Sequence, residues 1–339
     1  MVNNAKLIGT GHALPERVVT SEELEERMGF NKLNIRKGMA KLLSGVSERR
    51  IADRGVNASD LAAEAGKMAL EQANLQPEDV DMLIFSAVSQ DLVEPATANI
   101  VMDKLNIRNA KGIDVKNACN AFISSIEIAN MYIKCGNVKN VLIVSGEVLS
   151  VFIKMKFTDM EELKNVNSTF SVGDAGGAIV LQSYESEKND NNIQTRFKTF
   201  PDTWADGALL GGGTMYPHDP EKFYAQNESK EMLKLNFNRA VEFYNETIDM
   251  MDINYDKVSL FIPPQITKYI ITKMAEALKL PEDRVVCNVN NLGNISTASF
   301  PVALSMALRD GRLKLGSGQK VLCFGAANGF SAGVAYMTV

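Results

Sequence analysis

The feature that most limits how this chain can fold is an order of helix-like and strand-like segments that occurs twice. In each half, amphipathic stretches alternate with short apolar runs, which is typical of an α/β fold. The spacing repeats as well, since 34 residues separate Phe85 from Cys119 and 34 separate Ile262 from Ser296. We therefore predict two copies of one supersecondary plan, with functional groups where the copies meet. A chance match between two alternating stretches is the alternative.

The pattern assigns three helices and three strands to each copy. The expected helices cover residues 60–75, 96–107 and 120–136 in the first copy and 237–253, 267–280 and 295–311 in the second. The expected strands lie within 77–90, 111–119 and 140–147, and within 254–267, 284–294 and 320–329.

The two copies are expected to divide at the glycine-rich stretch TFSVGDAGGAIVLQ (169–182), interpreted as a turn. This gives an N-terminal unit of residues 1–175 and a C-terminal unit of residues 176–339. Residues 20–50 are predicted to form a charged, helix-like insertion. Residues 200–228, rich in Gly, Pro and aromatic side chains, are interpreted as an excursion over a pocket mouth, with an ordinary surface loop as the alternative.

Composition excludes several classes of function. The 339 residues carry a net charge of −5 and a pI near 5.4, so no general basic field attracts nucleic acid. The four cysteines lie far apart, without a CxxC pair, which argues against a zinc site or a disulfide framework and fits a reducing compartment. No run of about 18 apolar residues and no signal-peptide pattern occurs. We expect a cytoplasmic protein with no membrane span and no metal.

Cys119 is the candidate nucleophile, within DVKNACNAFISSIEIANMYI (114–133). The pattern places it where a strand ends and a helix begins. A thiol there meets the positive end of the helix dipole and unpaired backbone amides, which raise the thiolate fraction and can hold an oxyanion. The alternative is a cysteine packed as a small apolar side chain, which is how we interpret Cys135, Cys287 and Cys323.

Several stretches together resemble one enzyme family. The chain is similar along nearly its whole length to the thiolase superfamily, specifically to condensing enzymes of the ketoacyl-ACP synthase III type. "SAVSQDLVEPATA" and "KLLSGVSERR" are most similar to the head-to-head condensing enzymes of olefin and pyrone biosynthesis. The other matching stretches are LIGTGHALPERVVT, GVSERRIA, DVKNACNAFISSIEIAN, FSVGDAGGAIVL, NVNNLGNISTASFPVALSMALRDGRLKLG and CFGAANGFSAG.

This resemblance implies a five-layered αβαβα fold, a homodimer, and an acyl chain carried on Cys119 as a thioester. Its substrate would be an acyl thioester of coenzyme A or of an acyl-carrier protein, with no permanently bound cofactor. The amides of Cys119 and those near Ala327 and Asn328, in the FGAANG turn, would form the oxyanion hole. Asn294, in NNLGNISTAS, matches the family's asparagine.

The family's histidine has no match, because FIPPQIT places Pro264 at its position. The two histidines present, His12 and His218, do not belong to a strand end facing Cys119. Proline carries no donor, so half of the clamp that stabilises an enolate during decarboxylation is missing. We therefore predict that acyl transfer survives this substitution better than decarboxylative condensation does.

Glu94 and the carrier-binding positions complete the predicted site. In the head-to-head enzymes a glutamate in this EPATA context acts as a base that reaches the partner subunit's active site. A surface carboxylate before a Pro-started helix is the alternative for Glu94.

Coenzyme A users carry a tryptophan and an arginine where this chain has Met39 and Leu43, which leaves phosphate binding to basic residues nearby. These are Lys41, Arg49 and Arg50.

The leading hypothesis is an acyltransferase or condensing enzyme that works through an acyl-Cys119 intermediate in fatty-acid, polyketide or related secondary metabolism. A second hypothesis is a catalytically incomplete subunit that forms a heterodimer with a complete homologue. A thioester hydrolase is the third.

Overall fold

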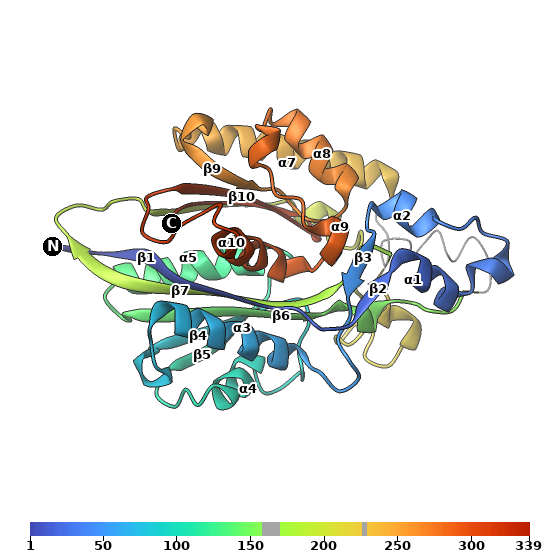
Figure 1. Cartoon of the computed structure of the whole chain (residues 1–339), viewed down its shortest axis with the longest axis horizontal. Helices are drawn as coiled ribbons and strands as arrows, with labels where there is room; N and C mark the ends of the chain where they lie inside the picture. Colours follow the sequence, from blue (N-terminus) through green and yellow to red (C-terminus); the bar gives the residue numbers. More distant parts are fainter. Residues whose placement is uncertain (158–169, 226–228) are drawn as a thin grey trace.

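Two mixed sheets form the body of the molecule and repeat one strand order (Figure 1). The computed structural model describes residues 1–157, 170–225 and 229–339. The first sheet runs β1 (Val2–Ala13), β7 (Asp174–Ser186), β6 (Asn140–Val148), β4 (Met82–Ser86), β5 (Lys111–Val115). The second runs β8 (Ile193–Thr199), β11 (Ser331–Thr338), β10 (Lys320–Ala327), β9 (Val258–Ile262).

Strand directions agree between the sheets as well. β4 pairs with β6, and β9 with β10, in parallel. The next two neighbours in each sheet are antiparallel: β6 with β7 and β7 with β1 in the first sheet, and β10 with β11 and β11 with β8 in the second. The predicted duplication is therefore confirmed in strand order and in direction.

The helices predicted for the two copies are all present. They are α3 (Ala58–Ala73), α4 (Thr97–Lys104) and α5 (Ala121–Lys134) in the first copy, and α7 (Lys230–Met250), α8 (Lys268–Ala277) and α10 (Ser299–Arg309) in the second. α7 begins earlier than predicted, because the Ser229 hydroxyl caps it by accepting from the Met232 amide.

The sheets are buried on both faces, which produces the layers. In β6, Val141 and Ile143 belong to the central core with α5 and α10, whereas Leu142 and Val144 belong to the outer core with α3. This alternation follows from the two-residue period of a strand. Residues of β10 divide in the same way between the central core and a core built with α7 and α8. The result is the expected thiolase-like fold, with α5 and α10 between the sheets.

The segment at 284–294 departs from the prediction, because it does not form a strand. It makes two isolated parallel bridges, Phe261 to Val285 and Val172 to Asn294, and between them the short helix α9 (Val289–Leu292). Beyond Val285, the Gln265 side chain bonds the backbone of this segment in place of a neighbouring strand. It donates to the Val286 carbonyl at 3.0 Å and accepts from the Asn288 amide at 2.9 Å.

The expected boundary at residues 175/176 falls inside β7, so the sheets divide the chain between Ser186 and Ile193 instead. The glycine-rich stretch is a strand because two helices approach it closely. A Cβ on Gly176 would lie 2.1 Å from the Leu61 carbonyl oxygen of α3, and one on Gly177 would lie 2.6 Å from Pro301 of α10. Glycine is needed there for packing, which a turn interpretation does not anticipate.

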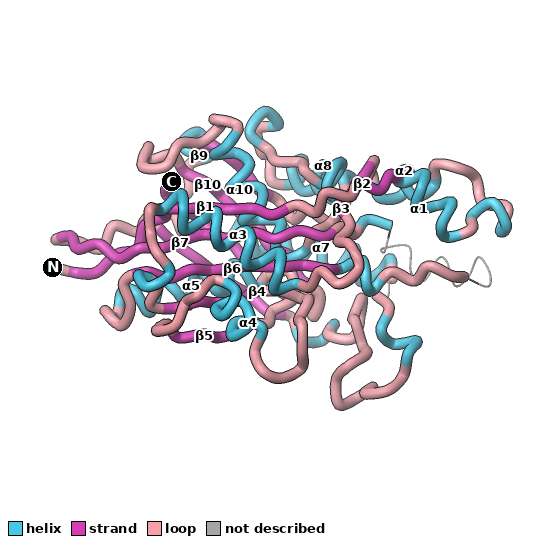
Figure 2. The backbone as a smooth tube through the Cα atoms, turned by 60° about the horizontal axis from the view of Figure 1, so that its bottom comes forward, coloured by secondary structure: helices cyan, strands magenta, loops and turns pink. Residues whose placement is uncertain are grey.

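Residues 20–50 form a helical insertion, as predicted. It holds α1 (Ser21–Met28) and α2 (Met39–Ser44) between the paired strands β2 (Val18–Thr20) and β3 (Glu48–Arg50). Figure 2 shows strands running through the middle of the molecule, with many loops toward the end that carries α1 and α2. Across the three described ranges, no helix has both the length and the apolar character needed to cross a bilayer.

Candidate active site

Cys119 lies directly before the first residues of α5, as predicted. The chain leaves β5 and turns through Ala118, whose φ of 44° is in the left-handed region. The Asn120 amide donates to the Asn117 carbonyl at 3.0 Å, and the Ala121 amide to the Ala118 carbonyl at 3.1 Å. These two bonds close the turn that places Cys119 two residues before α5 begins at Ala121.

The cysteine turn is attached to the opposite sheet by its neighbour Asn120, which is fully buried. The Asn120 Nδ2 donates to the Ser331 carbonyl at 3.0 Å and to the Ser331 hydroxyl at 2.9 Å. A Cβ on Gly325 would lie 2.0 Å from Asn120 Oδ1, so only glycine fits this crossing. These contacts fix the nucleophile relative to β10, β11 and the turn that joins them.

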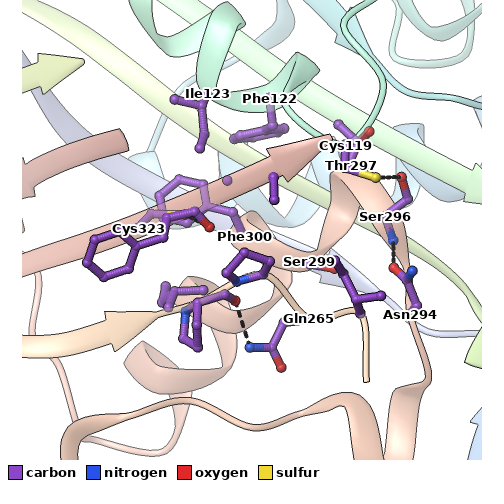
Figure 3. Close-up of a pocket in the computed structure, with 17 residues that line it drawn as sticks. Cys119, Phe122, Ile123, Gln265, Asn294, Ser296, Thr297, Ser299, Phe300 and Cys323 are labelled. Carbon is purple, nitrogen blue, oxygen red and sulfur yellow. Dashed lines mark hydrogen bonds between the residues drawn. The ribbon is translucent and has the colours of Figure 1, made fainter. Parts of the chain in front are cut away.

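The equivalent turn of the second copy contacts Cys119 at one side of the cavity (Figure 3). Ser296 Oγ donates to Cys119 Sγ at 3.1 Å, and the Ser296 amide donates to Asn294 Oδ1 at 2.9 Å. Because a backbone amide can only donate, this bond identifies the Asn294 oxygen and leaves its NH₂ group as a donor for another ligand. Ser296 has a φ of 45°, in the left-handed region that non-glycine residues rarely adopt. Each of the two turns therefore holds one such residue, Ala118 in the first and Ser296 in the second.

A buried carboxylate joins both turns to the loop after β4. Glu147 accepts from the Val88 amide at 2.9 Å, the Ser89 amide at 3.0 Å and the Thr297 amide at 3.3 Å. The Thr297 hydroxyl in turn donates to the Ala118 carbonyl at 3.1 Å. Burial raises the pKa of Glu147, and its hydrogen bonds oppose that shift. Sequence reasoning missed Glu147, since its position at the end of a predicted strand gave no signal.

Three of the predicted residues line one cavity: Cys119, Asn294 and Pro264. The rest of the wall is mostly apolar and includes Phe122, Ile123, Ile262, Phe300 and Phe324. Ala327 and Asn328 line an adjoining cavity that shares Pro264, Ile266 and Ala326 with the first. The Asn328 amide group also donates to the Gly207 carbonyl, which attaches the 200–225 excursion to this turn.

Glu94 is exposed in the single chain and does not line either cavity. It lies in the loop between β4 and α4, followed by Pro95. The structure therefore does not bring Glu94 together with Cys119 within one chain.

Arg49 is not available to a phosphate group, contrary to the expectation from sequence. The β2–β3 pairing turns its side chain inward, where it is fully buried. Its Nη2 donates to the Phe170 carbonyl at 2.6 Å and to the Ser21 hydroxyl at 3.2 Å, and burial lowers its pKa to about 10. Arg50 is half-buried and donates to backbone carbonyls of the loop before β2, whereas Lys41 is exposed.

The two histidines lie away from the cysteine cavity. His12 is buried under α10, where its Nδ1 lies 2.8 Å from the Ser305 hydroxyl, and burial lowers its pKa. His218 is exposed in the excursion. Neither lines either cavity. Among the residues with described positions, no cluster of His, Cys, Asp and Glu is arranged to hold a metal ion.

The chain is similar in sequence to known proteins of one family. Residues 113–200 match the family model of 3-oxoacyl-[acyl-carrier-protein (ACP)] synthase III, and residues 248–339 match the model of its C-terminal region. The chain is 32% identical over 336 residues to the β-ketoacyl-[acyl-carrier-protein] synthase III of Clostridium perfringens (strain SM101 / Type A), which covers 98% of this chain and 99% of the relative.

Solved structures agree with this similarity. The crystal structure of 3-oxoacyl-[acyl-carrier-protein] synthase III from Aquifex aeolicus has a TM-score of 0.83 at 29% identity, with 99% of this chain and 100% of that one covered. The fold is also similar to that of OleA from Xanthomonas campestris, crystallised with bound lauric acid and lauroyl-CoA. Its TM-score is 0.87 at 24% identity, with 100% of both chains covered.

Proposed function

The chain belongs to the 3-oxoacyl-[acyl-carrier-protein] synthase III family of acyl-transferring condensing enzymes, and from this we propose that it works through an acyl-Cys119 thioester. The observation that carries the proposal is the position of Cys119: at the start of α5, on an apolar cavity that Asn294 also lines. An apolar wall beside a thiol suits an acyl chain attached to that thiol.

The proposed loading step is an acyl transfer to the Cys119 sulfur. The thiolate attacks the carbonyl carbon of an acyl thioester, and the tetrahedral oxyanion is stabilised by the Cys119 amide and, as the family resemblance implies, by amides at Ala327 and Asn328 on the adjoining cavity. Each such donor is worth about 3 to 4 kcal/mol in the transition state. The carbon–sulfur bond to the carrier then breaks, and the acyl group stays on Cys119.

Pro264 limits what the loaded enzyme does next. We propose that it occupies the family's histidine position, since it lines the cavity together with Cys119 and Asn294. The Asn294 NH₂ group remains as one donor to an enolate oxygen, while proline supplies none. Acyl transfer to an acceptor is therefore favoured over decarboxylative condensation, which loses about 10²–10³ in rate with one donor missing.

We propose the acyl carrier and the oligomeric state from the family resemblance. The carrier is coenzyme A or an acyl-carrier protein, with Lys41 as the exposed basic candidate on α2 for its phosphates. A homodimer is supported by β5, the last strand in its sheet, whose outer edge can pair with a second copy. Glu94 would then act across the dimer, in the partner's site, which its exposure in the single chain permits.

Intact mass spectrometry tests the proposal. The purified protein is incubated with acyl-CoA and acyl-carrier-protein thioesters of several chain lengths, lauroyl-CoA among them. A mass increase of one acyl group is expected, and peptide mapping should place it on Cys119. Cys119→Ala should remain folded and unmodified. If no chain length gives an adduct on the wild-type protein, acyl transfer is not its function.

Pro264 beside the nucleophile also favours a second candidate, a subunit that completes its activity only with a homologue. Acyl turnover by the purified protein alone contradicts this candidate. Turnover that appears only after co-expression with a homologue that retains the histidine supports it.

A further inference from the structure

We propose that Ser296 is a catalytic residue: its hydroxyl donates a hydrogen bond to the Cys119 sulfur and stabilises the thiolate that attacks an acyl thioester. The inference deepens the acyl-transfer function and rests on it for its purpose. Its effect on the sulfur is nevertheless measurable without any acyl substrate.

The contact itself is direct. Ser296 Oγ lies 3.1 Å from Cys119 Sγ, with the hydroxyl donating (Figure 3). A hydrogen bond to an ionised group is about twice as strong as one between neutral groups, so this donor favours the thiolate over the thiol. Pro264, on the same cavity wall, has no hydrogen to donate. Ser296 thus donates a hydrogen bond to the sulfur in a cavity whose other walls are largely apolar.

The Ser296 side chain is held in position by its own backbone. Its amide donates to Asn294 Oδ1, and its φ of 45° lies where L-residues are uncommon. Strain of this kind persists only where the surroundings over-determine it, and it concentrates at functional sites. A glycine would adopt this backbone with less strain, so the backbone alone does not account for a hydroxyl here.

The duplicated plan explains why the two groups meet. Cys119 follows Phe85 of β4 by 34 residues, and Ser296 follows Ile262 of β9 by the same number. Each lies in the turn before a helix between the sheets, α5 or α10. The two equivalent turns therefore face each other, one with a thiol and the other with a hydroxyl.

The proposed step balances in protons and bonds. Cys119 first loses its proton to water, with the Ser296 hydrogen bond favouring the resulting anion. The sulfur then forms a bond to the acyl carbon, the carbon–sulfur bond to the carrier breaks, and the carrier thiolate takes a proton from water. Ser296 keeps its own proton throughout, so it stabilises charge and is not the general base.

The test is alkylation of Cys119 by iodoacetamide as a function of pH, followed by peptide mass spectrometry. Ser296→Ala and Ser296→Gly should each slow alkylation of Cys119 near pH 7 by about tenfold or more, the effect of losing a hydrogen bond to a charged group. Their pH profiles should move toward higher pH and meet the wild-type rate on the alkaline plateau. Ser299→Ala is the matched control, because it removes a hydroxyl from the same cavity wall, and its profile should equal that of the wild type.

Ser296→Gly separates chemistry from folding, since glycine tolerates the positive φ. The melting temperature of Ser296→Gly should lie within about 3 °C of the wild-type value, while alkylation of its Cys119 should remain slow near pH 7. Wild-type profiles in both Ser296 variants overturn the proposal, as does a rate loss that is the same at every pH. If the profiles shift but no acyl thioester ever loads Cys119, the role of Ser296 at the sulfur stands and the acyl-transfer function fails.

Discussion

The turn around Cys119 and the turn around Ser296 occupy equivalent places in the two copies, yet they carry different chemistry. Each opens a helix that lies between the sheets, and each brings a non-glycine residue into the left-handed region, Ala118 in one and Ser296 in the other. The first presents a thiol, and the second presents a hydroxyl and the Asn294 amide. The duplicated fold supplies two facing polar positions, and the side chains decide which is the nucleophile and which supports it.

The turns also differ in how they are anchored. The cysteine turn is held by a side chain, because Asn120 donates to Ser331 of the second sheet. The Ser296 turn is held through its own backbone groups: the bridge between Val172 and Asn294, the bond from the Gly173 amide to the Asn294 carbonyl, and the bond from the Thr297 amide to the Glu147 side chain. Each turn thus depends on the opposite half, so the site forms only when the two copies fold together.

The largest expected effect comes from giving the second copy the donor that it lacks. Pro264→His should raise the rate of decarboxylation of a malonyl thioester by about 100-fold, because an imidazole would join the Asn294 NH₂ group in stabilising the enolate oxygen. Release of carbon dioxide is the measurement. Pro264→Ala is the control, since it removes the ring without adding a donor. Equal rates in the histidine variant and the wild type would show that Pro264 does not limit this step.

Removing the side-chain anchor of the cysteine turn should have the next largest effect. Asn120→Ala leaves the buried carbonyl and hydroxyl of Ser331 without their donor, which costs about 2 kcal/mol in the free energy of unfolding. It should also slow alkylation of Cys119, because the turn is no longer fixed to β11. Urea denaturation and alkylation rates measure the two effects.

Asn130→Ala provides the comparison for that variant, since Asn130 lies on the same helix and donates only a longer bond, 3.4 Å, to the Ile193 carbonyl. It should leave the reactivity of Cys119 unchanged. If both variants slow alkylation equally, the effect belongs to α5 as a whole and not to the anchor.

Much of the plan was predictable from periodicity, because the alternation and equal spacing of the two copies reflect local patterns. The helices and the position of Cys119 before α5 follow from it, whereas Asn294 was assigned through the family resemblance. Arg49 was not predictable, since its buried partner, the Phe170 carbonyl, is 121 positions away in the chain. Gly176 and Gly177 were interpreted as a turn for the same reason: the helices that require them come from distant segments.

The carboxylate behind both turns gives a smaller, pH-dependent prediction. Burial raises the pKa of Glu147 in the folded chain above the ordinary value of 4.5. The folded state therefore holds this proton more tightly than the unfolded state does. The contribution of the protonated Glu147 to the free energy of unfolding is fully present below pH 4.5 and is lost as the pH rises through the folded pKa. The free energy of unfolding falls there by at most about 1.4 kcal/mol for each pH unit.

Glu147→Gln should remove that dependence. The free energy of unfolding of the variant should fall less steeply than that of the wild type as the pH rises from about 4.5 to 8. Glu64→Gln, at an exposed position of α3, should keep the wild-type slope. Parallel slopes in the Glu147 variant and the wild type would mean that the carboxyl is ionised as readily in the folded chain as in the unfolded one.

The smallest effect is expected at Ala118, and it makes the comparison between the turns most specific. Ala118→Gly relieves a φ of 44° but gives the unfolded chain more freedom, so the two contributions nearly cancel and the free energy of unfolding should change by less than about 1 kcal/mol. Because this residue offers the sulfur no hydroxyl, alkylation of Cys119 should keep its wild-type pH profile. The same backbone change at Ser296 should shift that profile. If Ala118→Gly shifts it equally, then relaxation of the turn, rather than loss of the hydroxyl, controls the thiol.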